Sequence, residues 1–152
     1  AVAGGRCGAD LALAPGVVVS AESALEAAIL AAMAADPGVR AKLGDPMRFE
    51  EAGAPRPAFP YLEFVRHESR PAGGVNVEAS EHRVDFAVVS RVLDGREAME
   101  AMHAVRAALD GAELAMGGWR CVLLLPVYLD ATRTRPGLWR ALLRVKAVVE
   151  RV

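Results

Sequence analysis

The residues that could carry catalytic or metal chemistry are few and scattered along the chain. Glu100 and His103 lie at positions i and i+3 of one expected helix, and His82 precedes Asp85 by three residues in an expected strand. A helical Glu-x-x-His pair binds a di-metal centre when a second copy and further carboxylates face it, and no second helix carries such a pair. His82 and Asp85 should point to opposite faces of a sheet. We therefore expect no metal site.

Nucleophilic catalysis and phosphate binding are not supported either. Cys121 lies in an apolar run and is expected to be a small core residue. The sequence contains no Gly-x-Ser-x-Gly motif, and the pairs Gly73-Gly74 and Gly117-Gly118 fit turns better than phosphate-binding loops. We expect no catalytic residue and no cofactor, and we expect that the protein is not an enzyme.

A basic set near the C-terminus is more informative. Residues 130–152 hold six basic and two acidic residues, a net charge of +4. The members of interest are Arg133, Arg135, Arg140, Arg144 and Lys146, of which the last three share one face of an expected strand. A solvated sheet face is one interpretation, and an interface with an acidic neighbour or with phosphates is the other. Leu142 and Val148 on the same face favour a protein contact. Trp139 points the other way, so base stacking has no aromatic partner there.

Length and composition define the class of protein. A chain of 152 residues is long enough for one domain with a sizeable core, and its formal net charge of −1 favours neither nucleic acid nor a membrane surface as a partner. Two cysteines form no disulfide framework, which is typical of a reducing compartment. No apolar run approaches the ~20 residues that span a bilayer. We expect an extension or arm over residues 1–19 and a single domain over residues 20–152.

The centre of that domain is an expected strand over residues 82–92 and the helix that follows it. Val84, Phe86 and Val88 alternate with more polar positions, the pattern of a strand with one face on a core. Asp94 and Glu97 are spaced as a capping box for the helix, whose apolar stripe extends to residue 109 before Asp110-Gly111 ends it. The capping motif and the glycine stop are both helix-boundary signals.

The remaining elements follow the same logic. We expect a helix over residues 20–35 that Ser20 or Ser23 can cap, a further turn of helix over 39–43, a proline-rich connector over 45–60 and strands over 61–66, 119–129 and 138–149. The apolar run 122–125 predicts a strand covered on both faces, and Pro126 predicts a bulge or an edge strand. Residues 130–137 are expected to be a polar turn. Residues 67–80 form either a mobile loop or a projecting hairpin. The order α-β-β-α-β-β predicts an α+β fold, with one mixed, mostly antiparallel sheet of about four to five strands and two main helices on one face.

Several segments together resemble a known family. They are the alanine-rich helix SALEAAILAAMAAD at 23–36, the Phe-Pro-Tyr-Leu segment at 59–62, the strand EHRVDFAVVSR at 81–91, the helix that begins Gly-Arg-Glu-Ala at 95 and ends Val-Arg-Ala-Ala-Leu at 109, and the last strand with Trp139 and its spaced arginines. In this order and spacing they resemble the tail terminator, or tail completion, proteins of long-tailed phages and gene transfer agents. The resemblance covers residues 20–150 and leaves the first 19 outside.

The resemblance implies a structural function. Such proteins form a ring, typically hexameric, which caps the tail tube, stops its growth and joins it to the head–tail connector. DNA passes through the lumen without sequence-specific contacts. On this basis the tube-docking loop would include Arg70, Gly73, Gly74, Asn76 and Glu78, and the basic set would face a neighbouring subunit or the connector. The protein would be assembled in the bacterial cytoplasm as part of a phage or gene transfer agent tail, with no membrane partner.

Two other classes of protein share these features. A head-completion or stopper protein of the neck has a similar size and also forms rings. A small ligand-binding regulatory domain would show a saturable small-molecule effect and no ring.

Overall fold

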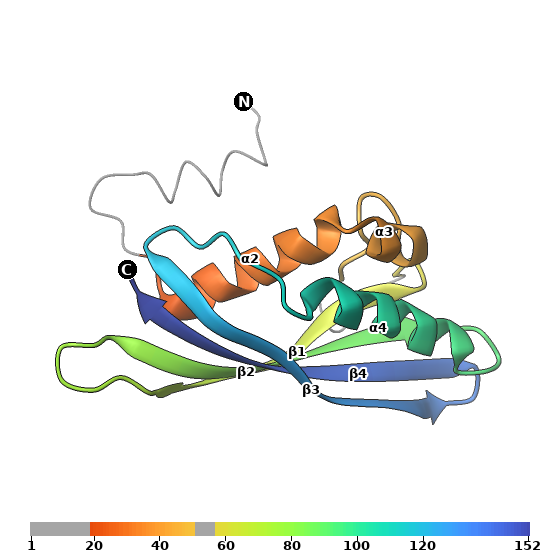
Figure 1. Cartoon of the computed structure of the whole chain (residues 1–152). Helices are drawn as coiled ribbons and strands as arrows, with labels where there is room; N and C mark the ends of the chain where they lie inside the picture. The colour runs from red at the N-terminus through yellow and green to blue at the C-terminus, as the bar shows by residue number, and fades with distance from the viewer. Residues whose placement is uncertain (1–18, 51–56) are drawn as a thin grey trace.

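The structure is a computed structural model that describes residues 19–50 and 57–152. In these residues three helices pack on one face of a four-stranded sheet (Figure 1). The elements are α2 (Ala21–Ala35), α3 (Pro37–Leu43), β1 (Tyr61–Pro71), β2 (Ala79–Ser90), α4 (Arg96–Leu109), β3 (Trp119–Arg135) and β4 (Leu138–Arg151). The predicted α+β class, with the two longer helices on one face, is confirmed. The predicted N-terminal arm lies outside the described residues except for Val19, as does part of the proline-rich connector.

The sheet has the strand order β1-β2-β4-β3, and every neighbouring pair is antiparallel. Each hairpin therefore contributes one inner and one outer strand, and β2 pairs with β4 at the centre. Phe86 of β2 lies opposite Phe64 on one side and Leu143 on the other. A parallel bridge between Phe49 and Leu62 adds a short contact beside β1.

The core fills the space between the helices and the sheet. Its helix side consists of the predicted apolar stripes, with Leu25, Ile29 and Met33 on α2 and Met102, Val105 and Leu109 on α4, all fully buried. Its sheet side consists of alternate residues of the two inner strands, such as Phe86 and Leu143. Burial of one large aliphatic or aromatic side chain stabilises a fold by roughly 1.5–3 kcal/mol, so these stripes hold the helices on the sheet.

The helix boundaries confirm one predicted cap and correct the other. The Ser20 side chain accepts a hydrogen bond of 3.1 Å from the amide of Ser23 at the start of α2, as expected. The capping box predicted for α4 is wrong, because the N-cap residue is Gly95, although the Asp94 side chain accepts a bond of 3.0 Å from the amide of Arg96 in the first turn. Glu97 instead accepts a bond of 2.6 Å from the Ser90 hydroxyl. A Cβ atom at position 95 would lie 2.8 Å from the Trp139 ring, which explains the need for glycine there.

The β3–β4 hairpin is longer than predicted. The strand β3 continues to Arg135, and the turn consists of Pro136 and Gly137, whose φ of +76° suits glycine. The prediction of a turn over residues 130–137 is therefore wrong. The polar side chains of this segment lie on an exposed part of β3, which pairs with β4 as far as Leu138.

The expectation that β3 is covered on both faces is also wrong. Val122 is 57% exposed and Leu125 is 42% exposed. The strand is an edge of the sheet, and its register with β4 shifts between Cys121 and Leu123. The predicted irregularity at Pro126 is confirmed, because a second shift lies between Pro126 and Tyr128.

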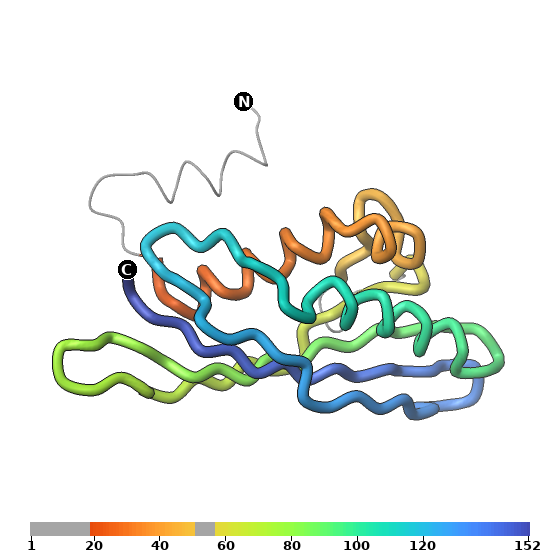
Figure 2. The backbone as a smooth tube through the Cα atoms, in the orientation of Figure 1, coloured from red at the N-terminus to blue at the C-terminus, as the bar shows by residue number. Residues whose placement is uncertain are grey.

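Of the two alternatives for residues 67–80, the structure shows the projecting hairpin. Strand β1 continues to Pro71 and strand β2 begins at Ala79. The segment between them projects past the start of α2 (Figures 1 and 2). The amide of Ala72 donates to the carbonyl of Ala79 at 2.9 Å, which closes the hairpin below its turn.

Candidate assembly surfaces

The tip of the projecting hairpin combines a strained turn with exposed apolar side chains. A Cβ at position 73 would lie 2.0 Å from the carbonyl oxygen of Val77, so only glycine fits there. Asn76 has a φ of +65°, in the left-handed region that asparagine tolerates better than most residues. Val75 is 89% exposed and Val77 is 51% exposed. Sequence reasoning selected the glycines and three polar residues of this segment and missed the two valines, although their separation by one residue is a strand-like signal.

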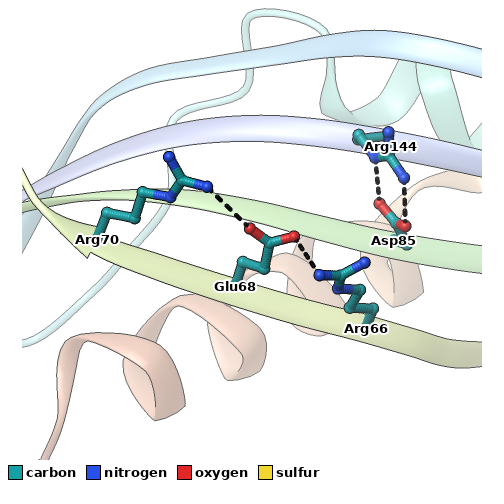
Figure 3. Close-up of polar contacts among 5 residues, drawn as sticks. All are labelled: Arg66, Glu68, Arg70, Asp85 and Arg144. Carbon is teal, nitrogen blue, oxygen red and sulfur yellow. Dashed lines mark hydrogen bonds and ion pairs between the residues drawn. The ribbon is translucent and has the colours of Figure 1, made fainter.

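Of the other predicted docking residues, Gly74 is in the turn, and Arg70 and Glu78 lie lower on the hairpin. The Arg70 guanidinium is exposed and lies 3.8 Å from the Glu68 carboxylate (Figure 3). The Glu78 carboxylate accepts a bond of 2.7 Å from Nε of Arg151 at the end of β4. Gly74 has open space around it. The structure therefore places all five predicted residues on one hairpin, with two of them already in ion pairs of the chain.

A polar cluster that the sequence did not reveal lies at the base of this hairpin, on the side that faces α2. The Glu26 carboxylate is 2.6 Å from Nδ1 of His67, and Nε2 of His67 is 2.9 Å from Nδ1 of His82. Nε2 of His82 is 2.7 Å from the Ser80 hydroxyl. Only the register of β1 and β2 brings the two histidines together, and a single sequence does not give that register. Burial lowers the pKa of His82 below its ordinary value, and the nearby His67 lowers it further.

The other candidate metal residues are separated. His82 faces the helices and Asp85 faces the open side of the sheet, as expected from their odd spacing. Glu100 forms an ion pair of 3.3 Å with Lys42, and His103 is exposed. Within residues 19–50 and 57–152, no group of three or more histidine, cysteine or acidic side chains is placed to hold a metal ion.

The open face of the sheet carries charged side chains that are paired across strands. Arg144 binds Asp85 through two hydrogen bonds of 2.9 Å and 3.0 Å (Figure 3). The other cross-strand pairs are Arg140 with Glu63 at 3.1 Å and Lys146 with Glu81 at 3.3 Å. The hydrogen bonds that Arg144 donates to Asp85 raise the pKa of the guanidinium, which keeps its charge. Three members of the predicted basic set are therefore neutralised within the chain.

The two remaining members lie apart from these pairs. Arg133 and Arg135 are exposed at the end of β3, beside the turn to β4. Among the described residues, neither side chain has a carboxylate within ion-pair distance. Within residues 19–50 and 57–152, these two arginines are therefore the members of the predicted set whose charge is not paired.

The outer edge of β3 is long and partly apolar. Besides Val122 and Leu125, Val127 is 48% exposed and Tyr128 is 49% exposed. An edge strand has unpaired backbone groups along its outer side, and exposed apolar side chains on such a strand favour association with another chain. Cys121 near its start is half-buried, and burial raises the pKa of its thiol.

Comparison with known proteins places this architecture in a family. Residues 27–150 match the family described as Tail completion protein gp17. The chain belongs to that family. A solved structure described as the virion of a native gene transfer agent particle contains a chain with the same fold, at a TM-score of 0.77 and 26% identity, over 87% of this chain and 99% of the other. No curated protein matches the sequence.

The family resemblance inferred from the sequence motifs is therefore confirmed. As a tail completion protein, the chain is a structural component of a phage-type tail. Within the described residues no helix is both long and apolar enough to cross a membrane.

Proposed function

We propose that this tail completion protein forms a ring, typically a hexamer, that caps the tail tube, ends its polymerisation and joins it to the head–tail connector. The observation that carries the proposal is the match of residues 27–150 to the tail completion family. The likeness to a chain of a gene transfer agent virion supports it. In this proposal, DNA passes through the lumen of the ring without base-specific contacts, and assembly takes place in the bacterial cytoplasm.

The sheet edges and faces supply the contacts between subunits in this proposal. The two edges are different strands, β1 and β3, so a contact from one edge to another surface of the next copy is heterologous. Heterologous contacts close into a ring when the rotation between copies allows it. The apolar edge of β3, with Val122, Leu125 and Val127, is the side that gains most from being covered.

The projecting hairpin docks on the tube in this proposal. Its predicted docking residues are Arg70, Gly73, Gly74, Asn76 and Glu78, and the exposed side chains of Val75 and Val77 add an apolar contact at the tip. Arg133 and Arg135 face the neighbouring subunit or the connector, because their charge is not neutralised by a described residue of the chain.

The experiment is electron microscopy of purified tail tubes mixed with the protein and with a variant, V75S/V77S. The proposal expects the wild-type protein on one end of each tube and the variant in solution. The variant L93S is a matched control, since Leu93 is also 89% exposed but lies before α4, and it should still cap tubes. Capping by V75S/V77S at wild-type levels would contradict the docking assignment. In electron microscopy of whole purified particles, protein located only on the head side of the head–tail joint would favour a neck-stopper function.

A further inference from the structure

The helix α2 is attached to the base of the projecting hairpin by two matched polar contacts. Glu22 accepts a hydrogen bond of 2.7 Å from the Ser69 hydroxyl, and Glu26 lies 2.6 Å from His67. The two acids are four residues apart on a helix, a rise of about 6 Å, and their partners are two residues apart on a strand, a rise of about 6.8 Å. This match of spacings lets one helix face hold one strand face at two points.

The second of these contacts continues through β1 into β2. Glu26 is an acceptor, so the proton of neutral His67 lies on Nδ1. Nε2 of His67 then accepts from Nδ1–H of His82, and Nε2 of His82 accepts from the Ser80 hydroxyl. Every ring nitrogen has a partner in this state. His82 itself is fully buried, so a lost partner there cannot be replaced by bulk water.

The pair can take up one proton without losing its central hydrogen bond, but not two. With one added proton, Nε2–H of His67 donates to Nδ1 of His82, and Nε2–H of His82 donates to the oxygen of Ser80. With two added protons, the Nε2–H of His67 and the Nδ1–H of His82 point at each other across 2.9 Å. Two positive charges then meet in a buried site. The central bond is then lost.

The charged groups around the pair do not remove this conflict. Glu22 and Glu26 of α2 are the acids that face the rings, and each already accepts a bond from β1. Opposite His82 and Ser80, β4 presents Ala147 and Val149. Further out, Arg151 and Glu78 are paired with each other beside Ser80. The neighbouring charged residues of β1 and β2, Glu68, Glu81 and Arg83, lie on the opposite face of the sheet.

We propose that the His67–His82 pair is a pH-sensitive latch that holds the projecting hairpin against α2 and opens when the pair binds its second proton. An exposed histidine has a pKa of about 6.5, whereas burial and the His67 ring lower the pKa of His82 in the closed state. The open state therefore binds more protons, so the latch keeps its full strength above about pH 6.5 and weakens as the pH falls below it. Any effect of the latch on tube docking rests on the proposed function, whereas the latch itself is a property of the isolated chain.

The first test is nitrogen-15 NMR of the histidine rings in the wild-type chain. At about pH 8 we expect both His67 and His82 to carry their proton on Nδ1, a tautomer that is the minor one for an exposed histidine. We expect His82 to become charged at a lower pH than it does in urea. A proton on Nε2 of His82 at high pH, or titration of His82 at the same pH as in urea, would overturn the proposal.

The second test is amide hydrogen exchange of residues 67–70 and 79–82, corrected for the intrinsic effect of pH. Between about pH 7.5 and 5 the wild-type rates should rise about tenfold for each unit by which the pKa of His82 is lowered. H103Q, the matched control at an exposed histidine, should behave like the wild type, and H82Q should show no rise. A flat wild-type profile, or an equal rise in H82Q, would overturn the latch. Failure to cap tubes changes neither result, so the two proposals are tested separately.

Discussion

At the scale of single residues, Asp85 of β2 holds Arg144 of β4 on the open sheet face. It is 4% exposed and both of its carboxylate oxygens accept bonds from Arg144. Glu68 on the same face is more exposed, and its partners Arg66 and Arg70 lie at the surface (Figure 3). Truncation of Asp85 removes two charge-assisted hydrogen bonds and leaves a void at a buried position, whereas water replaces the partners of the more exposed Glu68.

The variant D85A should therefore lose stability, and E68A should lose little. We expect D85A to lower the free energy of unfolding by about 1.5–3 kcal/mol, the range for hydrogen bonds to charged groups. E68A should cost less than about 1 kcal/mol. Urea denaturation followed by circular dichroism measures both. Equal losses in the two variants would show that burial of Asp85 does not matter.

Cys121 offers a second prediction at this scale. Burial raises the pKa of its thiol, so at about pH 8 the reactive thiolate fraction is smaller in the folded chain than in urea. Alkylation by iodoacetamide, followed by mass spectrometry of the peptide that contains Cys121, should be slower in the folded protein. The difference should shrink as the pH rises toward the raised pKa. An equal rate in both states at about pH 8 would contradict the burial of this thiol.

At the scale of elements, the shape of the projecting hairpin depends on one glycine of a pair. A methyl group at position 73 would collide with the backbone of Val77, while Gly74 has nothing within 4 Å. G73A should disturb the turn and reduce tube capping, whereas G74A should retain it. Nuclear magnetic resonance shifts of residues 72–78, with the capping assay, test this pair of variants. Normal capping by G73A would mean that the turn geometry is not needed for docking.

The elements also show what the sequence can and cannot predict. The apolar periods of α2, α4, β2 and β4 are local, so they predicted the helices, the inner strands and the α+β order. The length of β3 was missed because Thr132, Arg133 and Arg135 look like a polar turn. The cluster of His67 and His82 was missed because the pairing of β1 with β2 is a long-range property. The ion pairs of the basic set depend on register for the same reason.

At the scale of the whole molecule, the proposed ring uses the edge of β3 as a contact between copies. Its exposed apolar side chains are not needed for the core of the monomer, so a charged residue there should prevent assembly and leave the fold intact. L125E is the variant and L93E, at an exposed site before α4, is its control. Size-exclusion chromatography should show L125E as a monomer with unchanged circular dichroism and L93E as the wild-type assembly. An assembled L125E would exclude this edge from the interface.

The most direct test of ring formation is the mass of the native assembly. Native mass spectrometry of the wild-type protein at increasing concentration should show one closed species, with the mass of a hexamer and no series of larger oligomers, since a ring leaves no free edge to extend. A chain that remains monomeric at the highest concentration, or that forms an open-ended series of oligomers, would contradict the account.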